Sequence, residues 1–166
     1  MQTPICEVCL KSDVLCSSCQ DKLERKTISE FEINVLRFLY KMSEKIKILR
    51  EVNVVRVIDS GVILIVSARG DAAKLVGKEG YVVKALAKNF KRSIRVLEEA
   101  PDFKKFVQDL ISPSTIQGIN TLYTQEGTVY KIRIPVSQRS RMIIAPDSFT
   151  QIIENVYNKK VELVFD

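Results

Sequence analysis

Two glycines three residues apart, Gly77 and Gly80, interrupt what would otherwise be one continuous apolar helix. Apolar side chains recur with helical spacing over residues 72–76 and 81–90, so the pattern predicts two helices joined at a Gly-Lys-Glu-Gly loop. Glycine lacks a Cβ atom and readily adopts left-handed backbone angles. Such a joint lets main-chain N–H groups approach a phosphate at the positive end of the second helix, where Lys78 adds a cation.

The segments around this joint predict a small α/β unit. A long amphipathic helix is expected from Ser29, whose spacing to Glu32 is that of a capping box, to about Leu49. Two β-rich runs follow, joined by a turn at 59–61, and Asp71 is expected to cap the short helix before the loop. The expected strands are residues 52–58, 62–68 and 93–97.

The rest of the chain repeats this order without the glycines. The expected helices are 102–110, 138–144 and 149–157, and the expected strands are 116–123, 128–136 and 160–165. The two halves align so that Ala145-Pro146-Asp147-Ser148 falls on the glycine loop. Because Pro146 has no N–H and Asp147 would repel a phosphate, this joint is not expected to hold a nucleic-acid backbone. Asp147 or Ser148 is instead expected to cap the last helix.

The four cysteines of the chain form two C-x-x-C pairs separated by six residues. Two such pairs supply the four sulfur ligands of one tetrahedral structural Zn²⁺, with no open position for a reacting water. The alternatives are two disulfides, which a reducing compartment disfavours, or a redox C-x-x-C, for which one pair after a strand is typical. The expected metal ligands are Cys6, Cys9, Cys16 and Cys19. The charged segment 21–27 is expected to link this module to the next unit.

Composition favours a nucleic-acid partner over a membrane or a small substrate. The 166-residue chain carries a net charge of +6 and 28% charged residues, which suits binding to a polyanion. It contains no histidine, so triads and metal sites that need imidazole are excluded, and no catalytic residues are expected. No apolar run reaches the ~18 residues of a membrane span, and the N-terminus lacks a signal-peptide pattern. The expected location is cytoplasmic, with no membrane partner and no small-molecule substrate.

The loop and the element order around it resemble the K-homology (KH) domain of type II, an α/β sandwich that binds a short single-stranded nucleic-acid segment. The resemblance implies an α+β protein with three parts: a small zinc-ribbon or zinc-knuckle module over residues 1–26, a KH domain with an intact Gly-x-x-Gly over 27–100, and a degenerate KH-like domain over 101–166.

Tandem KH units after a four-cysteine module are similar to the archaeal NusA-like proteins that bear a zinc ribbon. This resemblance rests on the cysteines, on Gly77–Gly80, and on Gly118-Ile119-Asn120-Thr121 at the start of the second unit. It implies RNA binding without catalysis, in transcription elongation or termination, with RNA polymerase as a partner. The alternative is a ribosome-associated adaptor that acts in ribosome assembly or translation, in which the zinc module and the second unit bind protein.

The KH resemblance also implies which residues bind RNA. Three or four unpaired nucleotides would lie between the two helices and the adjoining strand, with phosphates on the glycine loop. Leu75, Val76 and Val83 are expected to form the floor, although Leu75 and Val83 are equally candidates for the core. The expected RNA-binding residues are Gly77, Lys78, Glu79, Gly80, Lys74, Lys84, Lys88, Lys91 and Arg92. In the second half, Lys131, Arg133, Arg139 and Arg141 form either a phosphate-binding cluster or a solvated face.

Overall fold

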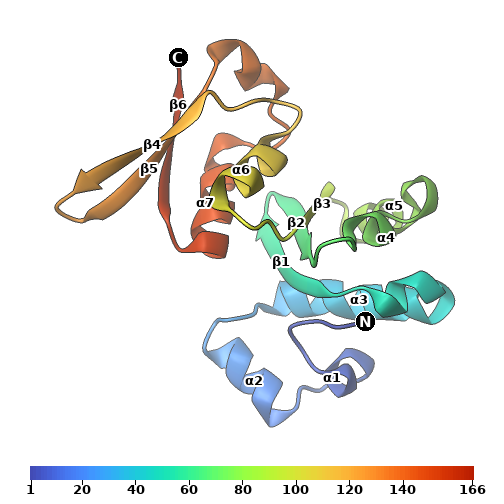
Figure 1. The fold of residues 1–166 in the computed structure, drawn as a ribbon. Coiled ribbons are helices and arrows are strands. Elements are labelled where there is room, and N and C mark those ends of the chain that lie inside the picture. The colour runs from blue at the N-terminus through green and yellow to red at the C-terminus, as the bar shows by residue number, and fades with distance from the viewer. The chain divides into compact units, whose positions relative to one another are not determined.

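The structure, a computed structural model, describes residues 1–166. The chain has a mixed α+β fold with two three-stranded sheets and divides into two compact units, Met1–Glu99 and Ala100–Asp166 (Figure 1). The first 26 residues belong to the first unit. None of the helices combines the length and the apolar character that a membrane span requires.

The first unit contains five α-helices, two 3₁₀ helices and one sheet. In chain order its elements are α1 (Glu7–Lys11), α2 (Ser17–Glu24), α3 (Glu30–Lys45), the 3₁₀ helix η1 (Lys47–Glu51), β1 (Val54–Ser60), β2 (Val62–Ser67), α4 (Ala72–Val76), the 3₁₀ helix η2 (Lys78–Gly80), α5 (Tyr81–Phe90) and β3 (Ile94–Glu98). The sheet order is β1-β2-β3, with β1 antiparallel and β3 parallel to β2.

Helix α3 is the central element of the first unit. Figure 1 shows α1 and α2 on one side of it and the sheet on the other. Its N-cap is Ser29, whose hydroxyl accepts a hydrogen bond from the Glu32 N–H at 3.1 Å, as the capping-box spacing predicts. Its apolar face buries Val35, Leu36 and Leu39 completely, so the core of the unit forms around them.

Two expectations about the helices around the sheet are wrong. The long helix ends at Lys45, and Leu49 belongs instead to η1. Asp71 precedes α4 but makes no side-chain cap, because its carboxylate accepts the Asn53 N–H at 2.9 Å. Asp71 therefore links the segment just before β1 to the start of α4 and does not cap that helix.

The second unit repeats the sheet topology of the first. Its elements are α6 (Phe103–Ile111), β4 (Gly118–Thr124), β5 (Gly127–Ile134), the 3₁₀ helix η3 (Val136–Arg141), α7 (Pro146–Tyr157) and β6 (Lys160–Phe165). The sheet order is β4-β5-β6, again with one antiparallel and one parallel pairing. Helices α6 and α7 lie on one side of this sheet (Figure 1). Phe106, Phe149 and Ile132 are buried in its core.

The region before α7 differs from the sequence prediction. The basic segment forms η3, not a helix over 138–144, and α7 begins at Pro146 with Ala145 as its N-cap. Asp147 and Ser148 lie inside the first turn, so the prediction that one of them caps the helix is wrong. Proline has a fixed φ and needs no hydrogen-bond acceptor at the first helical position, which explains why the helix starts there.

Candidate metal centre and nucleic-acid interface

The four cysteines come together at the start of two helices. Cys6 is the N-cap of α1 and Cys16 is the N-cap of α2, and the second cysteine of each pair lies in the first turn. All four Sγ atoms lie within 4.8 Å of one another. The segment holds no strand, so it is helical rather than a zinc ribbon, and α2 reaches Glu24, through most of the expected linker.

The spacing of the sulfur atoms suits a tetrahedral metal ion. Cys6 Sγ lies 3.4 Å from Cys9 Sγ and 3.9 Å from both Cys16 Sγ and Cys19 Sγ. With Zn–S bonds of about 2.3 Å, tetrahedral geometry separates the sulfurs by about 3.8 Å. No disulfide joins the four cysteines. The cluster can therefore hold a metal ion such as zinc, and the all-thiolate donor set favours a structural ion.

Backbone N–H groups point at two of the sulfurs. The Cys19 N–H donates to Cys16 Sγ at 3.4 Å, and this hydrogen bond, followed by those with the neighbouring thiols, lowers the pKa of Cys16 to about 7. The Cys16 N–H donates to Cys9 Sγ at 3.1 Å and lowers the pKa of Cys9, but burial and the adjacent thiols outweigh it and raise that pKa to about 12. The N–H groups favour thiolate at both sites, which is the form that binds a metal.

The four-cysteine cluster is part of the core of the first unit. Cys9 and Cys19 are buried in the same cluster as Ile5, Leu10 and residues of α3. Arg37 on α3 donates from Nε to the Cys9 carbonyl at 3.0 Å. Sequence reasoning missed Arg37, because its contact spans 28 residues and only the packing of α1 against α3 creates it. The centre can therefore stabilise the position of α3.

The glycine loop has a left-handed backbone at three of its four residues. Gly77 has φ 78°, Glu79 has φ 54° and Gly80 has φ 73°. A Cβ atom at Gly77 would lie 2.7 Å from Val82 Cγ2, so this position needs glycine both for its backbone angles and for the close approach of α5. The N–H groups of Lys78 and Glu79 have no acceptor within the protein. They are available to an oxyanion at the N-terminal end of α5.

The predicted RNA-binding lysines divide into two groups. Lys78, Lys84, Lys88 and Lys91 are exposed and make no ion pair. The Lys84 side chain passes beside the loop, because its Cε lies 3.6 Å from where a Cβ at Gly80 would be. Lys74, by contrast, lies 3.4 Å from Asp71 and 3.8 Å from Glu51.

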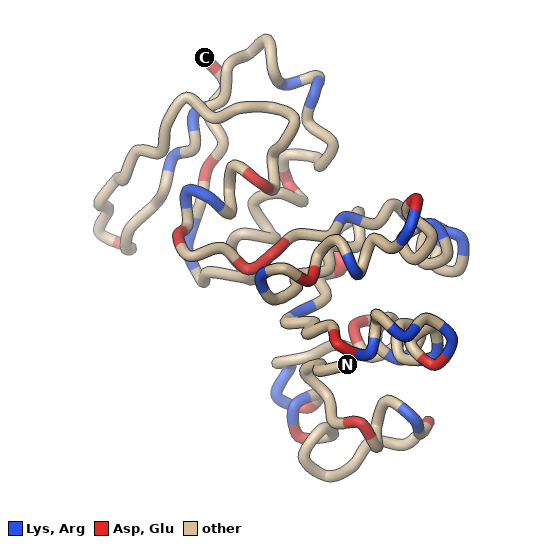
Figure 2. The backbone as a smooth tube through the Cα atoms, turned by 45° about the vertical axis from the view of Figure 1, so that its right-hand side comes forward, with Lys and Arg blue, Asp and Glu red and all other residues tan.

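Arg92 is held in place by the hairpin of the first sheet. Its guanidinium pairs with Asp59 and donates from Nε to the Gly61 carbonyl at 3.2 Å, and it stacks 5.1 Å from the centre of the Phe31 ring. These contacts give Arg92 a structural role at the β1–β2 turn. Figure 2 shows basic and acidic residues interspersed along the chain rather than gathered in one block. A candidate phosphate site is therefore judged by which cations are free at that place, not by the net charge of the chain.

The expected floor residues are not equally accessible. Leu75 is fully buried, so its expected contact with a base is wrong and the core interpretation holds. Val83 is partly buried, and Val76 is 36% exposed on the last turn of α4. Of the three expected floor residues, only Val76 and Val83 therefore present surface to a ligand.

The basic residues of the second unit are mostly engaged. Arg133 forms an ion pair with Asp166, and Lys131 lies 3.6 Å from Glu162. The Arg139 guanidinium stacks 5.0 Å from the centre of the Phe165 ring. These contacts favour the interpretation of a solvated face over that of a phosphate-binding cluster.

The comparisons with known proteins bear on the fold alone. No protein-family model and no curated protein matches the chain. Among solved structures, the chain is similar to the crystal structure of APE1850, with a TM-score of 0.63 and 16% sequence identity over 84% of this chain and 100% of that one. The likeness shows that the arrangement of elements occurs in a solved structure.

Proposed function

We propose that the protein binds single-stranded RNA, and that the loop from Gly77 to Gly80 holds the phosphates. The observation that carries this proposal is the free backbone of the loop: two N–H groups without acceptors, next to an exposed lysine, at the start of a 10-residue helix. N–H groups at a helix N-terminus, combined with a cation, form a favourable phosphate site. The KH resemblance of the loop and of its flanking elements supports the same assignment.

In this proposal both units are type II KH-like sandwiches, and only the first binds RNA through its loop. In the first unit the order is α3-β1-β2-α4-α5-β3, and in the second it is α6-β4-β5-η3-α7-β6, with the 3₁₀ helix η3 in the place of α4. Both sheets pair the first two strands antiparallel and the last two parallel. The four-cysteine centre, holding one zinc ion, stabilises the first unit and takes no part in chemistry. We assign no catalytic role to any residue.

The resemblance to archaeal NusA-like proteins favours a role in transcription elongation or termination, in the cytoplasm. The alternative is an adaptor on the ribosome, and the exposed apolar side chains of Val8 and Val14 in the cysteine module support it, because a protein partner could cover them. Both roles use the same RNA clamp in the first unit.

The clamp is tested by replacing Lys78 and Glu79 with aspartate in the full chain. Replacing Lys78 removes the cation and puts a carboxylate in its place, while Glu79→Asp brings the existing carboxylate closer to the backbone. Both changes repel a phosphate, so affinity for single-stranded RNA of about 12 nucleotides should fall by at least ~10-fold. The measurement is fluorescence anisotropy with labelled RNA. The matched control is Lys104→Asp, which makes the same charge change at an exposed position in the first turn of α6. Equal affinities for the double variant and the control would contradict the clamp.

The two cellular roles are separated by what accompanies the full-length protein. We suggest crosslinking in its own cells, purification through a tag, and identification of the bound RNA and proteins. Nascent transcripts with polymerase subunits support the transcription role. Ribosomal RNA with ribosomal proteins supports the adaptor.

A further inference from the structure

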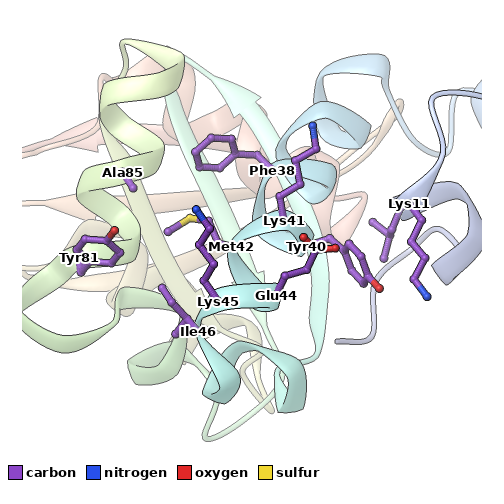
Figure 3. Close-up of a pocket in the computed structure, with 11 residues that line it drawn as sticks. Lys11, Phe38, Tyr40, Lys41, Met42, Glu44, Lys45, Ile46, Tyr81 and Ala85 are labelled. Carbon is purple, nitrogen blue, oxygen red and sulfur yellow. The ribbon is translucent and has the colours of Figure 1, made fainter.

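Two cavities of the first unit meet at Tyr81, the residue that follows the glycine loop. The smaller, of 340 Å³, is lined by Gly77 and Lys78 on the loop and by Ile46 and Ile48 before and within η1. The larger, of 570 Å³, lies between α3 and α5. Figure 3 shows Tyr81 and Ala85 on one wall of it and Met42 and Ile46 on the other. Tyr81 and Ile46 line both, so the two cavities adjoin, and the mainly apolar smaller one begins at the loop.

The exposure of Tyr81 is unusual among the aromatic residues near it. Phe31 and Phe38 pack edge to face against Phe90, with ring centres 5.8 and 5.7 Å apart. Tyr81, in contrast, is 62% exposed, contacts no other aromatic ring and makes no side-chain hydrogen bond. Its ring is thus available to a flat partner, which a nucleobase provides.

The charges around this surface suit a polyanion. Lys78 lines the smaller cavity, and Lys41 and Lys45 line the larger one; all three are exposed and make no ion pair. Glu44 is the one acidic residue that lines either cavity. An apolar floor with a mainly basic rim matches a single strand, whose bases need stacking surface and whose phosphates need cations.

We propose that Tyr81 stacks on an unpaired nucleobase of the bound RNA, and that the cavity beside Ile46 and Ile48 receives that base. This inference rests on the proposed function, since the phosphate next to the base would lie on the loop. A cavity of 340 Å³ is within the usual range of ligand pockets. The strand then continues over the α3 side of α5, where Lys41 and Lys45 contact its phosphates.

The test uses three variants of the full chain, Tyr81→Ala, Tyr81→Phe and Tyr81→Trp. Loss of one base–aromatic stack should weaken binding of random-sequence RNA of about 12 nucleotides by ~5-fold to ~150-fold in Tyr81→Ala. Tyr81→Phe keeps the ring and should bind like the natural chain. Because the chain contains no tryptophan, the emission of Tyr81→Trp reports on this position alone. Base-containing RNA should quench it, and an abasic strand of equal length should not.

The outcomes separate this inference from the clamp. If Lys78→Asp/Glu79→Asp loses affinity but Tyr81→Ala does not, the clamp stands and the stacking is overturned. The same result is expected if Tyr81 contacts a protein partner instead of a base. If Tyr81→Ala and the abasic strand both bind weakly while the loop variant binds normally, the stacking stands without the clamp. Absence of RNA binding by the natural chain overturns both. Circular dichroism of Tyr81→Phe and Tyr81→Ala shows whether the fold is intact.

Discussion

The loop before α5 and the turn before α7 occupy the same place in two units of the same sheet topology, yet their backbones differ. Gly77, Glu79 and Gly80 have left-handed angles, whereas Ala145 is extended with φ −59° and the helix begins directly at Pro146. The first joint presents two N–H groups without acceptors. The second begins with a residue that has no N–H at all.

This difference shows that the sheet topology does not by itself create a binding site. Both units bury an apolar core between helices and a three-stranded sheet. What distinguishes the first is a loop that needs glycine at Gly77, together with a four-cysteine cluster that packs on α3. Changes to features of the first unit should therefore have larger effects than matched changes at equivalent positions of the second unit.

The largest expected effect is that of removing the metal. A structural ion held by four thiolates contributes folding free energy, so chelation or Cys9→Ser should destabilise the first unit by more than about 3 kcal/mol. The second unit, which has no cysteine, should be unaffected. Elemental analysis under reducing conditions should find one zinc per chain, and hydrogen exchange should show the loss of protection confined to residues 1–99.

The matched control for the metal centre is Ser18→Ala, an exposed position between two of the ligands. Its stability and metal content should equal those of the natural chain. A chain without metal that keeps full protection in α3 would contradict the structural role of the cluster.

A smaller effect is expected from exchanging the joint residues. Gly77→Ala places a Cβ 2.7 Å from Val82 Cγ2 at φ 78°, and the combined strain and overpacking should cost about 2–5 kcal/mol. Ala145→Gly, at an extended N-cap, should change stability by less than about 1 kcal/mol. Urea unfolding of both variants measures the difference. Similar costs at the two joints would mean that the left-handed loop is not constrained by α5.

The smallest effect concerns a buried carboxylate found only in the first unit. Strand β1 ends its sheet, and Glu32 on α3 accepts the N–H of Val57 on that strand at 2.9 Å. Removing this acceptor in Glu32→Ala leaves a buried N–H unpaired and should cost about 1–3 kcal/mol. At the corresponding position of α6 stands Lys105, which pairs with Asp109 on the surface, and Lys105→Gln should cost less than about 0.5 kcal/mol.

Glu32 also makes stability depend on pH. Burial raises its pKa above the ordinary value of 4.5, against the opposing effects of the Val57 N–H and of Arg56. The folded state therefore favours the protonated carboxyl. The stability that this preference adds is fully present below pH 4.5 and is lost as the pH rises through the raised pKa. Glu32→Gln stays neutral and keeps the oxygen that accepts the N–H. Its stability relative to the natural chain should rise from pH 4 to pH 7, and a constant difference would contradict the shift.

Short-range patterns predicted much of the fold correctly. The turns at Gly61 and Gly127, the N-cap Ser29 and the break at Gly77 all follow from residues within a few positions of one another. The four-cysteine cluster was predicted for the same reason, since each C-x-x-C pair is a local unit. The errors arose where a distant partner competes, as at Asp71, whose carboxylate bonds to Asn53 instead of capping α4.

By itself the sequence determined the order of most helices and strands after Thr27, the pairing of the cysteines into two C-x-x-C units and the position of the glycine loop, because backbone preferences and residue spacing are local properties. It did not predict α1 and α2. Only the tertiary structure decided that Arg92 is bound to Asp59, that Leu75 is buried, and that Tyr81 stands exposed between two cavities. Such contacts depend on strand register and on how helices pack, which bring together residues far apart in the chain. A lysine pattern alone does not distinguish a free cation from a paired one.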